Sequence, residues 1–261
     1  MCIRDSLIWE VTKARISRIH LVLSRDKYRF FEKFLSETNN NLQVARADLP
    51  REALSMGSDG VEIIPHIQEN PGGVGDAISV ALGSIEGCFL VVLGDMVLIE
   101  KHHGPMQSGP NFASSASERL ISRFEESGRP CVGVVPVDLE EVKNYGVAEV
   151  ANNLVMNIEE KPTPAEAKSN LILCGRYIFP KETRDLLLKF PVSKHGELQS
   201  ILILNYLIKN GGLGAVNLEG MEMYDSGDPM SWLKSQIDHG LRRDDTYSEL
   251  SEWLTNRLSR I

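Results

Sequence analysis

The sequence lacks the features of a membrane or secreted protein. Its 261 residues contain no apolar run near the roughly 20 residues that a membrane helix needs, and the longest run is about Cys88–Leu93. No basic start leads into an apolar signal core. We therefore expect no membrane partner and a cytoplasmic location.

Cysteine is scarce, with 4 widely spaced residues and no Cys-x-x-Cys pair. Three of them, Cys88, Cys131 and Cys174, lie in apolar runs, where a free thiol packs as a small hydrophobic group. This usage fits a reduced cytosolic compartment. The length of the chain excludes a small scaffold held by disulfides.

A surplus of basic residues is also absent. The chain has 36 acidic and 28 basic residues, which gives a formal net charge of −8. A protein whose main partner is nucleic acid usually carries the opposite balance. We therefore expect no nucleic-acid partner.

The pattern that is present is an alternation of apolar strands and amphipathic helices, which predicts a single α/β domain over residues 1–261. Strands are predicted at Arg18–Ser24, Val61–His66, Cys88–Asp95, Cys131–Pro136, Val147–Val150, Leu154–Ile158, Leu171–Phe179 and Ala215–Leu218. Helices are predicted at Leu7–Ala14, Asp26–Ser36, Gly75–Ile85, Ser114–Ser127, Lys181–Lys189, Glu197–Lys209, Pro229–Leu241 and Thr246–Leu258.

The first six residues, Met1–Ser6, have no periodicity and lead directly into the first helical segment. Two interpretations stay open. The hexapeptide is either non-native, as read-through at the end of a sequence fragment, or an ordinary frayed terminus.

A carboxylate ends one of the apolar strands. Leu93-Gly94-Asp95 closes the strand predicted at Cys88–Asp95, and ligands of open α/β sheets bind beyond the carboxyl ends of strands. An acidic residue there, behind a glycine that allows close approach, can hold a divalent cation. Asp95 is therefore a metal candidate, and a cap of the following turn is the alternative.

A glycine-rich turn joins a strand to a helix at Gln68–Ala77. Glycines such as Gly73 let backbone N–H groups approach an anion or a base, and they direct the helix N-terminus toward it. The segment is neither G-x-G-x-x-G nor a phosphate-binding loop that ends in Gly-Lys-Ser, so a plain turn is the alternative.

Two further segments place charged residues at turns. Lys161 leaves a predicted strand just before Pro162, which holds its side chain near the sheet edge, where it can neutralise phosphate. A charged hairpin edge is the alternative. Asp225 and Asp228 lie in a turn before a helix, and a helix cap accounts for one of them and leaves the other free for a metal.

Taken together and in this order, these segments resemble the sugar-nucleotide pyrophosphorylases, a family of nucleotidyltransferases. The similarity covers most of Leu7–Arg242 and leans toward the uridylyl branch. The residues that carry it are Gln68 with Pro71-Gly72-Gly73-Val74-Gly75, Leu93-Gly94-Asp95, Tyr145-Gly146-Val147, Glu160-Lys161-Pro162, Ser169-Asn170-Leu171 with Gly175-Arg176-Tyr177, Gly196-Glu197-Leu198-Gln199, and Tyr224-Asp225-Ser226-Gly227.

The resemblance implies a Rossmann-like mixed sheet of the nucleotide-diphospho-sugar transferase type. It also implies an Mg²⁺-dependent reaction in which glucose 1-phosphate attacks the α-phosphorus of UTP, giving UDP-glucose and pyrophosphate. The partners expected from it are UTP, glucose 1-phosphate and further copies of the chain in a homo-oligomer.

The matched positions imply a role for each candidate residue. Asp95 and Asp225 would be metal ligands, and Lys161 would bind the sugar phosphate; these three would form the catalytic set. Glu160 and the backbone of Gly146 would hold sugar hydroxyls. Gln68 with Gly73 would read the uracil edge, since an amide presents both a donor and an acceptor to a pyrimidine imide.

The sequence departs from the family pattern at its start. The family opens with a strand and a Gly-rich loop that carries an Arg and a Lys, and nothing before Leu7 matches that segment. We therefore expect an N-terminally truncated enzyme that is inactive by itself. The alternatives are a thymidylyl or other sugar-phosphate nucleotidyltransferase, and a domain that has lost catalysis and acts in binding or regulation.

Smaller departures concern single residues. Asp76 stands where a His or Gln is more usual, and Met96 stands where a second acidic residue is common. His102 and His103 lie in an enlarged loop with no third metal ligand nearby, so we interpret the pair as loop surface rather than as a zinc site.

Overall fold

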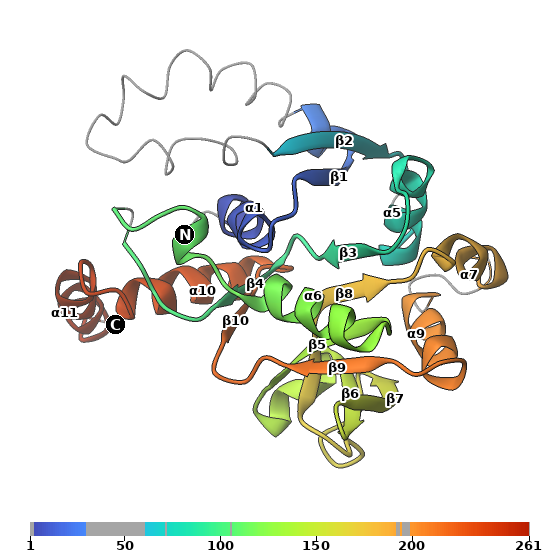
Figure 1. The fold of residues 1–261 in the computed structure, drawn as a ribbon. Coiled ribbons are helices and arrows are strands. Elements are labelled where there is room, and N and C mark those ends of the chain that lie inside the picture. The colour runs from blue at the N-terminus through green and yellow to red at the C-terminus, as the bar shows by residue number, and fades with distance from the viewer. Residues whose placement is uncertain are drawn as a thin grey trace.

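The computed structural model describes residues 3–29, 61–70, 72–104, 106–191, 194 and 199–260. Its central element is a six-stranded sheet with the strand order β3-β8-β5-β9-β7-β6 (Figure 1). Strand β5 pairs parallel with β9 and antiparallel with β8, so the sheet is mixed. The bounds are β3 Phe89–Val92, β5 Cys131–Pro136, β6 Gly146–Ala151, β7 Leu154–Glu160, β8 Leu171–Phe179 and β9 Gly214–Asn217.

Two small sheets accompany the central one. Strands β1 (Arg18–Ser24) and β2 (Glu62–Gln68) pair in parallel, and β4 (Met96–Ile99) and β10 (Glu222–Asp225) pair antiparallel. The sequence pattern did not predict β4 or β10. Each is 4 residues long, which is too short to show a periodicity of its own.

Helices pack around the sheets, and two of them have clear capping residues. Asp228 caps α10 with Pro229 in the first turn, and α6 ends at Gly128, whose φ of 64° is left-handed. The bounds are α1 Ile3–Lys13, α5 Val74–Ala81, α6 Ala116–Ser127, α7 Thr183–Lys189, α9 Gln199–Lys209, α10 Pro229–Leu241 and α11 Tyr247–Leu258, with 3₁₀ turns at Leu82–Ser84, Pro110–Phe112 and Leu139–Asn144.

Most elements lie where the sequence predicts them, and β5, β8 and α10 have the predicted bounds. The first helix begins at Ile3 rather than at Leu7, so residues 3–6 are helical. The helix predicted at Asp26–Ser36 lies mostly outside the described residues. Within the described part of the chain, no helix is both long and apolar enough to span a bilayer.

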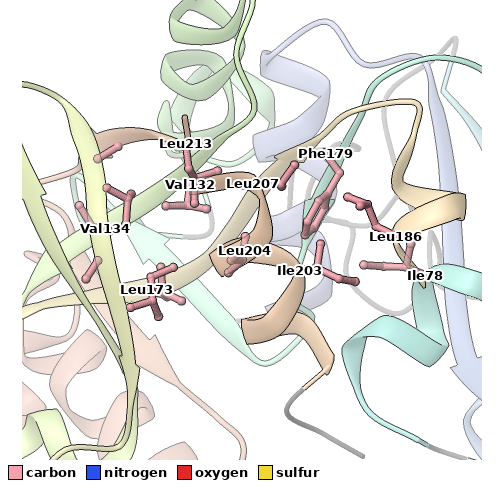
Figure 2. Packing of buried hydrophobic residues seen from close by; sticks show 14 of the residues in the cluster. Ile78, Val132, Val134, Leu173, Phe179, Leu186, Ile203, Leu204, Leu207 and Leu213 are labelled. Carbon is pink, nitrogen blue, oxygen red and sulfur yellow. The ribbon is translucent and has the colours of Figure 1, made fainter. Parts of the chain in front are cut away.

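The core has two apolar layers, one on each face of the six-stranded sheet. Neighbouring residues of β5 alternate between the layers, because successive side chains of a strand point to opposite faces. The layer against α5, α7 and α9 includes Ile78, Val132, Val134, Leu173, Phe179, Leu186, Ile203 and Leu204 (Figure 2). The layer against α6 includes Leu98, Ala116, Leu120, Cys131, Val135, Ile172, Cys174 and Leu218. Burial of both faces explains why these strands are continuous apolar runs in the sequence.

The cysteines differ in burial. Cys131 and Cys174 are buried as expected, and burial raises the pKa of each thiol to about 12. Cys88 is exposed, so the prediction that it packs as a small hydrophobic group is wrong. It precedes β3 and lies outside the strand ladder that buries the other two.

A buried ion pair that the sequence did not predict joins the first helix to the sheet. The Arg176 guanidinium donates to both oxygens of Glu10, through Nε to Oε1 and Nη2 to Oε2, each at 2.8 Å. Arg176 is 0% and Glu10 is 1% exposed. Arg176 Nη1 also donates to the Met96 carbonyl at 2.9 Å, and Ser117 Oγ donates to Glu10 Oε1 at 2.5 Å. The pair therefore connects α1, β8, β4 and α6.

Breaking this pair will destabilise the protein strongly. Removing one partner leaves the other charge buried without compensation, so Arg176→Met is expected to lower the free energy of unfolding by about 3–5 kcal/mol in urea denaturation. The control is Arg18→Met, which breaks the exposed 2.9 Å pair of Arg18 with Glu62 and is expected to cost about 1 kcal/mol or less. Equal changes in the two variants would contradict a structural role for the buried pair.

Candidate functional site

The ladder between β4 and β10 brings two predicted site residues together. Asp95 directly precedes β4, and Asp225 ends β10, where it pairs with Met96. The backbone N–H and the hydroxyl of Ser226 both donate to the Asp95 carbonyl at 2.8 Å. Main-chain contacts therefore fix the two aspartates, from distant parts of the sequence, side by side.

The two carboxylates face one small space beside Gly227. Asp225 Oδ1 accepts a hydrogen bond from the Gly227 N–H at 2.8 Å. A Cβ atom on Gly227 would lie 3.1 Å from Asp225 Oδ1 and 3.7 Å from Asp95 Oδ2, so a side chain there would fill the space between them. Asp95 is exposed and Asp225 is half-buried, so both are accessible to a ligand.

This donor set fits a magnesium ion. Carboxylate oxygens are the hard ligands that Mg²⁺ prefers, and Mg²⁺ is usually held by one or two carboxylates together with substrate phosphates. Across the described ranges there is no cluster of three or more His, Cys, Asp or Glu side chains that could hold a metal. A cation beside Asp95 and Asp225 would thus take its remaining oxygens from water or a bound phosphate.

Asp228 has a separate function, as the sequence suggested for one of the two turn aspartates. Its Oδ1 accepts from the N–H groups of Met230 at 2.9 Å and Ser231 at 3.1 Å, which caps α10. The hydrogen bonds to Ser231 and Met230 also lower the pKa of its carboxyl. The cap therefore occupies Asp228 and leaves Asp225 available.

Tyr145 connects Asp225 to Lys161, which follows β7. The sequence had assigned no role to this tyrosine. Burial, followed by the negative charge of the adjacent Asp225, raises the pKa of the Tyr145 phenol to about 12, so the hydroxyl stays protonated at neutral pH. The Tyr145 carbonyl accepts from the Lys161 N–H at 2.9 Å. Its only sequence signal was its place in the Tyr145-Gly146-Val147 motif.

The predicted sugar-binding residues lie together on β6 and β7. Gly146 pairs with Glu160 across the antiparallel ladder. A Cβ on Gly146 would lie 3.2 Å from Glu160 Oε2, so the glycine leaves room for that carboxylate. Lys161 follows with a left-handed φ of 49°, which is uncommon outside glycine and occurs mostly at functional sites or turns. Its side chain is 58% exposed, and its Nζ lies 4.0 Å from Glu160 Oε1.

Tyr177 is affected by charges from both the sugar-binding residues and the aspartate pair. Burial is the main cause of the raised pKa of the Tyr177 phenol, and the negative charges of Glu160 and Asp95 add to it. Glu160 and Asp95 therefore both act electrostatically on the Tyr177 side chain.

Gln68 and Gly73 form a second group on the strand–turn–helix unit of β2 and α5. Gln68 ends β2, and Gly73 has a φ of 92° at the start of α5. Gln68 Nε2 donates to Asp76 Oδ2 at 2.5 Å, and the Gly72 N–H donates to the same oxygen at 3.3 Å. The contact with Asp76 was not expected from the sequence.

The interpretation of His102 as loop surface is wrong. The half-buried His102 ring lies with its Nδ1 3.0 Å from Nδ1 of His239, and its edge faces Tyr224 with ring centroids 6.0 Å apart. One ring must donate and the other accept, so the two cannot both be charged. His103 remains within its loop, where its ring contacts Phe112 at 5.0 Å between centroids.

Comparisons with known proteins identify the relatives of this chain. The family described as Nucleotidyl transferase matches residues 3–239. The chain is 30% identical over 260 residues to a UTP–glucose-1-phosphate uridylyltransferase of Haemophilus influenzae, covering 95% of this chain and 85% of that protein. It is 28% identical over 259 residues to UTP–glucose-1-phosphate uridylyltransferase 2 of Streptococcus pyogenes, covering 95% of this chain and 83% of that protein.

Solved structures share the fold. A UDP-glucose pyrophosphorylase from Acinetobacter baumannii superposes with a TM-score of 0.76 at 24% identity, covering 97% of this chain and 87% of that one. A protein described as a glucose-1-phosphate thymidylyltransferase from Bacillus anthracis gives 0.69 at 20% identity, covering 93% and 82%. The expected mixed sheet of the nucleotide-diphospho-sugar transferase type is thereby confirmed.

The buried histidine pair predicts a loss of stability in mild acid. Burial, aided by nearby positive charge including that of Arg243, lowers the pKa of His239 from 6.5 to about 4. Between these values the unfolded chain binds a proton that the folded chain does not. The free energy of unfolding should therefore fall as the pH falls, by up to about 1.4 kcal/mol per pH unit.

Urea denaturation at several values from about pH 7 to pH 5 measures this slope. His239→Gln is expected to reduce it, because the variant removes the histidine with the large shift, while His102, whose pKa burial also lowers, keeps part of the slope. His103→Gln, outside the buried pair, is the control and is expected to keep it. The same slope in His239→Gln as in the unchanged chain would contradict the assignment.

Proposed function

Because this chain belongs to the nucleotidyl transferase family, we propose that it transfers the uridylyl group of UTP to glucose 1-phosphate, giving UDP-glucose and pyrophosphate. The observation that carries the proposal is the meeting of Asp95 and Asp225 beside Gly227, connected through Tyr145 to Lys161. The names of the uridylyltransferase relatives support this choice of substrates.

The reaction is a displacement at phosphorus. A phosphate oxygen of glucose 1-phosphate forms a bond to the α-phosphorus of UTP, and the bond from that phosphorus to the pyrophosphate oxygen breaks. Two polyanions must approach each other, so catalysis depends mostly on positioning and on neutralising negative charge.

Asp95 and Asp225 supply the carboxylates that would hold Mg²⁺, and the bound ion would offset the phosphate charge. The backbone ladder keeps both aspartates in place before any ligand binds. Tyr145 stays protonated beside Asp225, so its hydroxyl can donate a hydrogen bond to an oxygen in the site. These features preorganise the site for a phosphate group.

Lys161 is the cation for the sugar phosphate. Its left-handed backbone and the buried Pro162 after it hold the start of the side chain, while the amine remains exposed. Glu160 accepts hydrogen bonds from sugar hydroxyls, since an ionised carboxylate only accepts. The backbone of Gly146, across the ladder, holds a sugar hydroxyl, and the absence of a side chain there leaves room for the Glu160 carboxylate.

Gln68 and the backbone of Gly73 read the nucleobase. The amide offers an acceptor and a donor to the imide edge, which uracil and thymine share. Transfer from dTTP is therefore the second candidate function, and competition between UTP and dTTP separates the two.

Loss of either aspartate is expected to abolish turnover. The assay measures pyrophosphate release from UTP, glucose 1-phosphate and Mg²⁺. It is run on the 261-residue chain and on a version with a Gly-rich segment of the family fused before Leu7. Asp95→Asn and Asp225→Asn each remove a carboxylate from the cation and should be inactive while still folded.

Asp228→Asn is the matched control, because Asn is also a good helix cap and the residue faces α10 rather than the carboxylate pair. It should retain activity. Near-normal activity in Asp95→Asn or Asp225→Asn removes that residue from the site. No pyrophosphate from UTP in either version of the unmutated chain contradicts the proposed reaction.

Lys161→Ala is expected to raise KM for glucose 1-phosphate and lower kcat. A charge-assisted contact to phosphate corresponds to roughly a 10- to 100-fold loss in kcat/KM. Lys161→Arg should restore little, because the planar guanidinium differs from a point charge. Lys168→Ala, at the exposed 3.3 Å pair with Glu149, is the control and should change neither constant. A change confined to the KM of UTP would show that Lys161 does not bind the sugar phosphate.

A further inference from the structure

The side chain of Gln68 is tied to one carboxylate. Its Nε2 lies 2.5 Å from Asp76 Oδ2, and the Gly72 N–H lies 3.3 Å from the same oxygen. Both side chains are half-buried, with Gln68 at the end of β2 and Asp76 in the first turn of α5. The hydrogen bond between Gln68 and Asp76 thus joins the two ends of the turn that contains Gly73.

This contact determines which way the amide of Gln68 points. An ionised carboxylate can only accept hydrogen bonds, so the NH₂ group of the amide must face Asp76 and the carbonyl Oε1 must face away. Within the part of the chain that the structure describes, nothing donates to Oε1. The free edge of Gln68 therefore presents Oε1 as an acceptor and the second N–H of Nε2 as a donor.

A fixed amide distinguishes two kinds of pyrimidine. In uracil, N3–H donates and the neighbouring carbonyl accepts, which complements this free edge. In cytosine, N3 accepts and the neighbouring amino group donates, so the amide would have to turn over to pair with a base held in the same register. Turning it over would place Oε1 against the Asp76 carboxylate, with two acceptors facing each other.

We propose that Asp76 is a positioning residue that sets the nucleobase selectivity of the site, by locking the Gln68 amide in the orientation that accepts an imide and rejects cytosine. The inference rests on the proposed role of Gln68 and Gly73 in reading the base. In this proposal the backbone of Gly73 sets the position of the base. Asp76 sets which end of the Gln68 amide donates to the base and which end accepts.

A purely structural role for Asp76 makes a different prediction. An acidic residue in the first turn of a helix stabilises its N-terminus, and the hydrogen bond from Gly72 would contribute to that. Loss of such a role would weaken the fold and the binding of all nucleotides together. Only a role in orienting the Gln68 amide predicts a change in the ratio of the affinities for UTP and CTP.

The experiment is isothermal titration calorimetry of the 261-residue chain with UTP and with CTP in the presence of Mg²⁺. Asp76→Asn keeps the shape and can still accept from Gly72, but its own amide can face either orientation of Gln68. Asp76→Ala removes the contact entirely and is the second variant. Ser79→Ala is the matched control, since Ser79 Oγ donates to the Asp76 carbonyl at 2.7 Å and not to its carboxylate.

The unchanged chain and Ser79→Ala are expected to favour UTP over CTP by about 10-fold or more, the factor of a charge-assisted hydrogen bond. Asp76→Asn should bring the two affinities to within about threefold, chiefly by improving the binding of CTP. Asp76→Ala should reduce the ratio in the same direction. Thermal unfolding confirms that each variant is folded.

An unchanged ratio in the folded Asp76 variants, or an equal loss for both nucleotides, overturns the inference. Gln68→Ala separates this failure from that of the proposed function. If Gln68→Ala keeps the preference for UTP, Gln68 does not read the base, and both proposals about it fail. If it abolishes the preference while Asp76→Asn leaves it intact, only the role of Asp76 is wrong.

Discussion

An arginine with no exposure to solvent connects four parts of this molecule. Arg176 in β8 forms a bidentate pair with Glu10 of α1 and donates to the Met96 carbonyl in β4, while Ser117 of α6 binds Glu10. Burying two charges costs several kcal/mol for each ion, and the arrangement is stable only because each guanidinium nitrogen has an acceptor. Met96 is adjacent to Asp95, so the hydrogen bond from Arg176 to the Met96 carbonyl holds the backbone next to the carboxylate site.

Backbone hydrogen bonds explain how the like charges of Asp95 and Asp225 stay side by side. Adjacent carboxylates repel each other, and their side chains do not hold Asp95 and Asp225 together. The β4–β10 ladder does so, together with the hydrogen bonds that the N–H and the hydroxyl of Ser226 donate to the Asp95 carbonyl. Both carboxylates remain accessible to a ligand, and a bound cation would offset the repulsion between them.

Recognition of the base and neutralisation of phosphate depend on different elements in our proposal. The strand–turn–helix unit of β2 and α5 presents Gln68, and its orientation depends on a single carboxylate from Asp76. Asp95 and Asp225 lie on the β4–β10 ladder, and Lys161 follows β7. A substitution in the first unit can thus alter nucleotide choice without changing the charges that act on phosphate, because no hydrogen bond or ion pair joins the two sets among the described residues.

The sequence by itself determined the features that depend on neighbouring residues. The apolar runs of β5 and β8 and the cap of α10 are local signals, and the turn before α10 showed that Asp225 or Asp228 would be free. The family resemblance implied that Asp95 and Asp225 hold the same metal, and the tertiary structure showed the ladder that brings them together. Only the tertiary structure decided that Arg176 is paired and that His102 meets a distant histidine. Those contacts join residues far apart in the chain through short strands and single side chains, whose partners no local periodicity can specify.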